Sequence, residues 1–342
     1  MLKRSARISI IALLILFLIG CKTTKISTDE DGSSNVKKES EREKITVVLD
    51  WVPNTNHTGM YVAIENGYYE EEGLEVEIIQ PSAGGSADLI AARQGDFGIS
   101  HQEQMVYAKT TDDPLPIQAI ATIIQHNTSG MASPVYKNIK NPKDFEGKKY
   151  GGWGSPIEEA ILKGLMEVEG GNYNKLEIID IGTSDFFTSV ENYVDFTWIY
   201  YGWDGVAAEL QDYDLNFIKL QDIVPALEFY TPVIIAHEKL LNENPELARR
   251  FLKATTRGYD FAIENPEKAG KAFLKHVPEL DGEMVIASQK YLAKEYKADA
   301  PRWGEMKKEV WETYGEWMYE KGLIENRLDP NNAFTNEYLP KE

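Results

Sequence analysis

Ten mostly polar residues, 50–59, constrain the fold of this chain more than any other segment. The β-branched run at residues 45–49 precedes them and predicts a short strand. Residues 60–67 follow them and predict a helix that ends at Gly67. In open α/β sheets, ligands bind beside such loops because the N–H groups of the helix N-terminus point at the crevice. The segment therefore predicts an α/β fold with a candidate ligand loop.

The loop carries side chains that suit a polar ligand. Pro53 removes one backbone donor and disfavours helix at the residue before it. Asn54 and His57 offer amide and imidazole groups that can bind the polar edge of a ligand. The alternative is a turn followed by a helix cap at Thr55 or Asn56, with no ligand. These residues alone leave both interpretations open.

The N-terminal segment predicts an exported lipoprotein. Basic residues precede an apolar run at residues 8–19 that is too short for a membrane span and suits a signal peptide over residues 1–20. The residues before Cys21 resemble a bacterial lipobox, and Cys21 is the only cysteine, so we expect it to carry lipid. A lone cysteine excludes an intramolecular disulfide and a thiolate metal site. Residues 21–44 are polar and charged, which predicts a flexible tether.

Strands and helices alternate along the rest of the chain, which predicts βαβ units and mostly parallel sheets. A length of 342 residues suits two lobes. We expect residues 45–130 to form the first part of lobe I and residues 131–230 to form lobe II. Residues 231–342 are expected to complete lobe I and to be mostly helical. The first crossing between the lobes is expected in the small-residue run 129–134, and the return crossing at 229–236.

A second dense stretch, residues 193–205, predicts a strand that ends near Gly202. Aromatic residues on a strand usually pack in a core, and we expect this of Phe196 and Trp198. Aromatic residues just past a strand end are better placed to flank a planar ligand. The residues in this position are Tyr200, Tyr201 and Trp203.

A carboxylate would complete a pocket for an amino-bearing heterocycle, because it accepts hydrogen bonds from N–H groups. Glu103, Glu158 and Glu191 are the candidates, and the sequence does not choose among them. Glu158 is equally explained by a capping box with Ser155. Trp153 precedes that cap and is a further candidate ligand contact, as is Trp51 in the first loop.

Charge and composition exclude several classes of function. A formal net charge of −19 argues against a nucleic-acid-binding face. The candidate stretches contain no arginine that would clamp an anion, and Arg93 is expected to face solvent. Residues 84–86 are expected to be a tight turn, with Ser86 capping the next helix, rather than a phosphate nest. No cluster with metal-ligand spacing accompanies His57 or His101, so we expect neither a metal nor a cofactor.

Residues 49–59, together with residues 67–74 and 84–86, resemble the NMT1/THI5-like family of solute-binding proteins. The match is best to the branch that binds thiamin pyrimidine precursors, and it covers roughly residues 44–335. The resemblance implies a two-lobed clamshell of the type II periplasmic-binding-protein kind, in which Asn54 contacts the ligand and aromatic residues of the second lobe sandwich the ring. It also implies a monomeric, lipid-anchored receptor on the extracellular face of the membrane that delivers its ligand to an ABC importer permease.

Two alternatives remain. Sister branches of the family bind riboflavin or sulfonates for the same kind of importer. Eukaryotic members are enzymes of pyrimidine synthesis that carry a cysteine-rich iron motif. This chain has no cysteine after Cys21, so we expect a binding protein rather than an enzyme.

Overall fold

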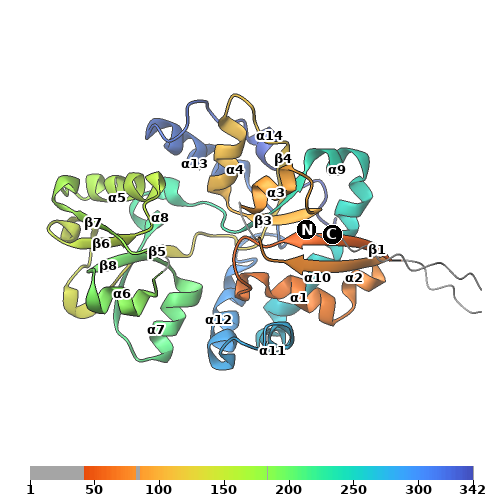
Figure 1. The fold of residues 1–342 in the computed structure, drawn as a ribbon, viewed down its shortest axis with the longest axis horizontal. Coiled ribbons are helices and arrows are strands. Elements are labelled where there is room, and N and C mark those ends of the chain that lie inside the picture. The colour runs from red at the N-terminus through yellow and green to blue at the C-terminus, as the bar shows by residue number, and fades with distance from the viewer. Residues whose placement is uncertain (1–41, 82–84, 183, 342) are drawn as a thin grey trace, which may run out of the picture. The chain divides into compact units, whose positions relative to one another are not determined.

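The computed structural model describes residues 42–81, 85–182 and 184–341 (Figure 1). Two five-stranded sheets organise them, with strand orders β2-β1-β3-β10-β4 and β7-β6-β8-β5-β9. The predicted signal peptide, Cys21 and the tether as far as residue 41 lie outside the described residues. In the described ranges, no helix combines the length and apolar character needed to span a membrane.

The first sheet is parallel except for one strand. Strand β10 runs antiparallel to both of its neighbours, β3 and β4. The apolar runs of β3, β4 and β10 bury their side chains on both faces, as a sheet covered by helices requires, whereas β2 alternates apolar with exposed acidic residues. The strands are β1 (Glu43–Val48), β2 (Leu74–Ile79), β3 (Phe97–Ser100), β4 (Ile117–Thr122) and β10 (Val233–His237).

The second sheet repeats this plan. Strand β6 is parallel to β7 and β8, and β5 is antiparallel to β8 and β9. In each sheet the antiparallel strand is therefore the one that the chain enters directly from the other sheet. The strands are β5 (Ser129–Pro134), β6 (Lys149–Gly152), β7 (Glu177–Asp180), β8 (Phe196–Tyr200) and β9 (Leu215–Lys219).

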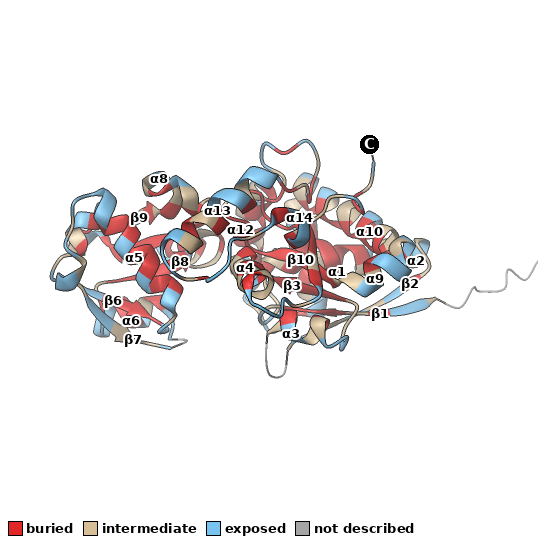
Figure 2. Ribbon diagram, turned by 90° about the horizontal axis from the view of Figure 1, so that it is seen from above, coloured by how far each residue is buried: buried red, intermediate tan, exposed pale blue. Residues whose placement is uncertain are grey.

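Helices cover both sheets, with their apolar sides buried and their polar sides exposed (Figure 2). Proline at the first position and a polar N-cap residue start several of them, as at Ser155 and Asn244. The helices are α1 (Thr58–Glu65), α2 (Tyr68–Glu71), α3 (Ser86–Ala91), α4 (Gln102–Thr110), α5 (Pro156–Val168), α6 (Phe186–Asn192), α7 (Val206–Leu210), α8 (Leu220–Ile223), α9 (Glu238–Glu243), α10 (Pro245–Glu264), α11 (Pro266–His276), α12 (Gly282–Glu295), α13 (Lys308–Glu320) and α14 (Pro330–Ala333).

The predicted two-lobed α/β architecture is confirmed, but the predicted position of the first crossing is wrong. Residues 129–134 are strand β5, and residues 123–128 make the connection. Small residues are needed in β5 because it is the central partner of β8 and β9: a Cβ on Gly130 would lie 2.5 Å from the carbonyl oxygen of Ile218. The return connection comprises residues 228–232, directly before β10.

The sequence predicted that the C-terminal region belongs to the first lobe alone, but this region also packs against the second lobe. Helix α13 places Trp311 in a core cluster with residues of β4 and β10. One turn later, Tyr314, Trp317 and Met318 join the cluster that contains Tyr150 of β6 and residues of β8. The helix therefore packs against both lobes. It begins at Lys308, and Trp303, which precedes it, stacks on Tyr259 at 4.2 Å.

Helix α3 also departs from its predicted capping. Gly85 occupies the N-cap position, while the hydroxyl of Ser86 is buried and donates to the carbonyl oxygen of Ile99 in β3. At the other end, Arg93 takes the left-handed conformation (φ 59°), which is more usual for glycine. Gly95 leaves room for Val48, because a Cβ there would lie 2.6 Å from that side chain. Arg93 is exposed, as predicted, and Gly84 lies outside the described residues.

Candidate ligand-binding site

The loop after β1 is a capped turn. Asn54 is the N-cap of a short 3-10 turn, Thr55–His57, and its Oδ1 accepts from the backbone N–H of Asn56 at 2.9 Å. Its amide nitrogen donates to the carbonyl of Val52 at 3.1 Å. The cap that the sequence placed at Thr55 or Asn56 is therefore Asn54 itself. This local bonding fixes Asn54 at the edge of the strand, where the sequence predicts the ligand.

His57 supports the loop from below. It is fully buried, its Nε2 lies 2.8 Å from Oδ1 of Asp50, and its Nδ1 accepts from the backbone N–H of Asn54 at 3.2 Å. Both ring nitrogens are engaged, so the expectation that His57 binds the ligand directly is wrong. Burial alone would raise the pKa of Asp50, but the hydrogen bond and charge of His57 and the charge of His101 lower it. The loop thus rests on a buried, hydrogen-bonded pair.

A pocket of about 240 Å³ opens between this loop and the carboxyl end of β8. It draws on the loop after β1, the end of β8 and the turn that follows it, both connections between the sheets, and the segment around α12. Its lining residues are Trp51, Val52, Pro53, Asn54, Thr55, Asn56, Ile124, Thr128, Tyr200, Gly202, Trp203, Asp204, Thr231, Leu280 and Leu292. The structure therefore brings together four of the predicted residues: Trp51, Asn54, Tyr200 and Trp203.

Aromatic side chains form one wall of the pocket. Tyr200 is the last residue of β8, and it continues a row of rings in which Trp198 lies 6.3 Å from Tyr200 and 5.4 Å from Trp153. Phe196 and Trp198 are buried in the core, as predicted. Trp153 is half-exposed at the far end of the row and does not line the pocket.

The chain leaves β8 through a π-helical turn, Tyr201–Gly205, rather than the predicted start of an α-helix. Each residue of a π-helix advances the side chain less around the axis than in an α-helix, which alters which residues face the pocket. Trp203 and Asp204 face the pocket, and Tyr201 does not. Its ring packs against Phe217 and Tyr291 at 5.0 and 5.3 Å, and its hydroxyl donates to Glu209.

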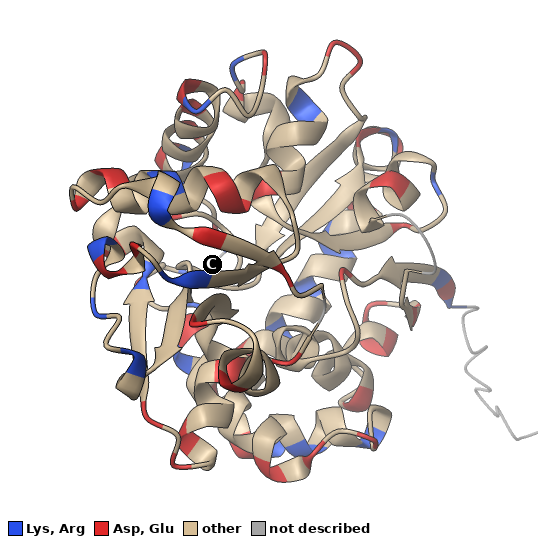
Figure 3. Cartoon of the chain, turned by 60° about the vertical axis from the view of Figure 1, so that its left-hand side comes forward, with Lys and Arg blue, Asp and Glu red and all other residues tan. Residues whose placement is uncertain are grey.

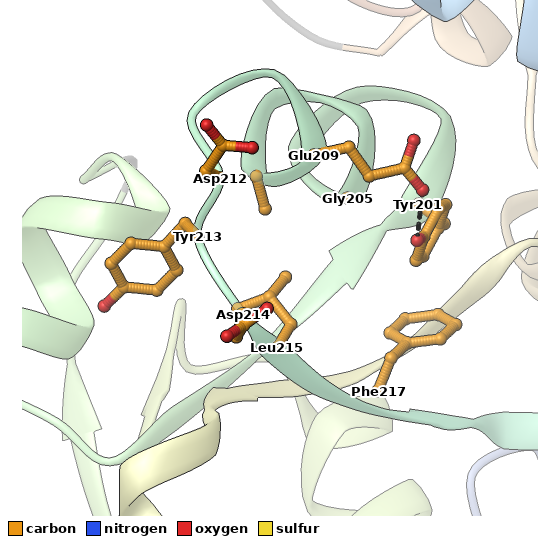
Figure 4. A pocket seen from close by; sticks show the side chains of 9 residues that line it. Tyr201, Gly205, Glu209, Asp212, Tyr213, Asp214, Leu215 and Phe217 are labelled. Carbon is orange, nitrogen blue, oxygen red and sulfur yellow. Dashed lines mark hydrogen bonds between the residues drawn. The ribbon is translucent and has the colours of Figure 1, made fainter.

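Tyr201 lines a different pocket, on the second lobe (Figure 4). This pocket has a volume of about 350 Å³ and is bordered by α7 and β9. Tyr213, Leu215 and Phe217 provide its apolar surface, and Glu209, Asp212 and Asp214 provide carboxylates. It contains none of the other predicted ligand contacts.

Asp204 is the functional candidate that the sequence analysis missed. Among the described residues that line the pocket beside Asn54, it is the charged one. Burial, followed by the charge of Asp185, raises the pKa of Asp204 to about 6. No basic side chain in the described part of the chain pairs with it. Backbone hydrogen bonds stabilise part of its charge, and the carboxylate can accept further hydrogen bonds from a ligand. Its position between Trp203 and Gly205, at the strand end, is the feature of the sequence that could have identified it as a ligand contact.

The three predicted glutamates have other positions. Glu158 is buried and accepts from Tyr150 Oη at 2.7 Å and from the backbone N–H groups of Trp153 and Ser155, which confirms the capping box and occupies its carboxylate. Glu191 is exposed on α6 and lines neither pocket. Burial and the charge of Glu158 raise the pKa of Glu103 to about 7 on the first turn of α4, outside the pocket lining.

Acidic and basic residues are distributed over many of the helices and loops (Figure 3). Many of them form exposed pairs, such as Lys163 with Glu159 and Lys271 with Glu267, which contribute little to stability. The pocket, in contrast, combines apolar and amide groups with a single carboxylate from Asp204. A ligand that donates hydrogen bonds fits this arrangement, and an anion does not.

A model of the family described as NMT1/THI5 like matches residues 54–269, which include Asn54, most of the pocket lining and most of both sheets. The chain belongs to the NMT1/THI5-like family. It is 28% identical over 340 residues to the formylaminopyrimidine-binding protein of Halalkalibacterium halodurans, covering 97% of this chain and 99% of the relative.

Other relatives show the range of the family. The chain is 22% identical to the 4-amino-5-hydroxymethyl-2-methylpyrimidine phosphate synthase of Legionella pneumophila, over 87% of this chain and 93% of the synthase. In fold it is similar to the periplasmic aliphatic sulphonate binding protein SsuA of Escherichia coli, with a TM-score of 0.67, 14% identity, and coverage of 86% and 99%. The two-lobed binding-protein fold is thereby shown.

Proposed function

We propose that this protein is the substrate-binding component of an ABC importer and that it captures a thiamin pyrimidine precursor, either formylaminopyrimidine or hydroxymethylpyrimidine. The observation that carries the proposal is Asp204, a partly buried carboxylate without a cation, in a pocket walled by Tyr200 and Trp203. An aminopyrimidine supplies what this pocket lacks, because its amino N–H groups donate and its ring is planar.

The interactions have ordinary magnitudes. A hydrogen bond to a charged group contributes roughly 1.5–3 kcal/mol, and each aromatic stacking pair adds about 0.5–1.5 kcal/mol beyond burial of area. Asn54 lies opposite, in the loop after β1, and its amide can bind the polar edge of the same ring. Asp204 and Asn54 therefore recognise the ligand from the two lobes.

The 28% identity to a formylaminopyrimidine-binding protein, over nearly the full length of both chains, supports this ligand class. A sulfonate would place a negative charge beside Asp204, and none of the described lining residues is an arginine or lysine that would offset it.

We also infer that the protein acts as a binder rather than as a synthase. The chain has no cysteine after Cys21, so it lacks the cysteine-rich iron motif of the enzyme branch. Attachment of lipid at Cys21 would hold the protein at the extracellular face of the membrane, beside its permease. Labelling with a radioactive fatty acid, compared with Cys21→Ser, tests that attachment.

Calorimetric titration of the purified protein with formylaminopyrimidine, hydroxymethylpyrimidine, thiamin, riboflavin and taurine tests the ligand. We expect one of the two pyrimidines to bind most tightly, and Asp204→Asn to weaken that binding at least about tenfold. Asp212→Asn is the matched control, because Asp212 lies in the other pocket and should leave binding unchanged. Preferred binding of riboflavin or taurine would overturn the assignment.

A further inference from the structure

A chain of buried hydroxyl groups connects the ligand loop to the second lobe. Ser288, on α12, is fully buried, and its Oγ lies 2.6 Å from Oγ1 of Thr55. The same Oγ donates to the carbonyl oxygen of Gly202, in the π-helical turn after β8. A serine hydroxyl has one hydrogen, so Ser288 accepts from Thr55 while it donates to Gly202. Thr55, Ser288 and Gly202 thus form one directional chain.

Surrounding contacts hold this chain of hydroxyl groups in place. The hydroxyl of Tyr296 donates to the carbonyl of Thr55 at 2.5 Å, so α12 holds the backbone of the ligand loop as well as its side chain. On the other side, α12 packs directly on the turn of the second lobe. A Cβ on Gly202 would lie 2.8 Å from Cδ2 of Leu292, and the rings of Tyr201 and Tyr291 are 5.3 Å apart.

Both ends of this hydrogen-bonded chain line the candidate pocket. Thr55 follows Asn54, and Gly202 precedes Trp203 and Asp204. We propose that Ser288 is a positioning residue that holds the two halves of the pocket together through its hydroxyl group. The inference rests on the proposed function of this pocket as the ligand site. Separating the lobes here breaks the bond between Ser288 and Gly202, so this bond favours the closed arrangement and slows release of the ligand.

Dissociation kinetics of a bound pyrimidine test the proposal. In Ser288→Ala, we expect the dissociation rate of hydroxymethylpyrimidine to rise about three- to tenfold, with a smaller change in the association rate. Thr55→Val should act in the same direction. Because the two hydroxyls belong to one chain, the double variant should resemble Ser288→Ala rather than show the product of both effects.

Thr255→Val is the matched control. Thr255 is also a buried hydroxyl, bonded to Tyr69 at 2.8 Å, but both residues belong to the first lobe. This variant should lower thermal stability and leave the dissociation rate unchanged. A dissociation rate of Ser288→Ala equal to that of the unmodified protein would overturn the proposal, as would fully additive effects of Ser288→Ala and Thr55→Val.

X-ray scattering of the protein without ligand tests the role of Ser288 independently of the proposed function. Gly202→Ala should push Leu292 away and enlarge the radius of gyration, and Ser288→Ala should enlarge it to a smaller extent. An unchanged radius in both variants contradicts the positioning role. Failure of the unmodified protein to bind either pyrimidine refutes the proposed ligand instead, and the scattering result still decides whether Ser288 joins the lobes.

Discussion

The imidazole of His57 and the carboxylate of Asp50 meet at 2.8 Å beneath the ligand loop. His57 accepts from the backbone N–H of Asn54 with its other nitrogen, so its Nε2 carries the hydrogen that is donated to Asp50. Asp50 in turn lies 3.5 Å from Nε2 of His101. The position of Asn54 in the pocket therefore depends on a buried pair that does not itself line the pocket.

Asp50→Asn should destabilise the protein by about 3 kcal/mol at neutral pH, because it removes one partner of a buried pair. The folded pKa of Asp50 lies below its usual value, so its contribution to stability is present above that value and is lost as pH falls through the folded pKa. Chemical unfolding between pH 2 and 7 should show a shallower acid loss in the variant. Equal slopes in the variant and the unmodified protein would contradict this assignment.

Asp204→Asn should raise the stability of the protein and weaken its binding of ligand. The pKa of Asp204 is raised to about 6, so the stability that its protonated form contributes is present below the unfolded pKa and is lost as pH rises through about 6. At pH 7 the amide should therefore stabilise the unliganded protein by about 1–3 kcal/mol while pyrimidine affinity falls. Thermal unfolding with and without ligand measures both effects. A variant that is destabilised without ligand would show that Asp204 has a structural partner.

The neighbouring tyrosines should differ in their effect on binding. Tyr200 is the last residue of β8 and lines the pocket, whereas Tyr201 comes directly after it and faces away from the pocket. Tyr200→Ala should weaken pyrimidine binding by about 1–2 kcal/mol through loss of stacking and burial. Tyr201→Ala should lower stability, since it loses contacts with Phe217 and Tyr291, and should weaken binding clearly less than Tyr200→Ala does. Fluorescence titration distinguishes the two, and equal losses would refute the orientation.

Features with local causes were predictable from the sequence. Ser155, Pro156 and Glu158 specify a helix start by themselves, and the structure shows that capping box. The strand alternation that buries Phe196 and Trp198 also places Tyr200 and Tyr201 on opposite faces, so the sequence contained the information that separates the two tyrosines. Tyr200, Tyr201 and Trp203 were nonetheless all expected to contact the ligand.

Features that depend on tertiary contacts were not predictable. The π-helical turn that contains Asp204 packs against α12, where a Cβ on Gly202 would meet Leu292, and the local sequence does not reveal this contact. Helix α13 has an apolar stripe of ordinary spacing, and that stripe does not reveal that Trp311 and Tyr314 pack in different lobes. The choice of Asp204 over Glu103, Glu158 and Glu191 likewise depends on tertiary structure, because the position of Asp204 at the strand end does not by itself show that it lines the pocket.

A histidine joins the two connections between the lobes and should make stability depend on pH. His126 lies in the first connection, 2.8 Å from Glu228 at the start of the second and 2.8 Å from Asp299, which also faces Lys307 at 3.7 Å. The hydrogen bond to Glu228 is the largest cause that raises the pKa of His126, to about 8, against the opposing effect of burial.

The contribution of protonated His126 is fully present below its unfolded pKa of about 6.5 and is lost as pH rises through about 8. Its side chain is 37% exposed, so water screens the pair and the effect stays below about 1 kcal/mol. His126→Gln should remove the decline in unfolding free energy between pH 6.5 and 8.5, measured in urea at constant ionic strength. His237→Gln is the control, because burial lowers the pKa of His237 and that residue should not produce a decline in this range. The assignment fails if the decline persists in His126→Gln, because another group must then titrate between the lobes.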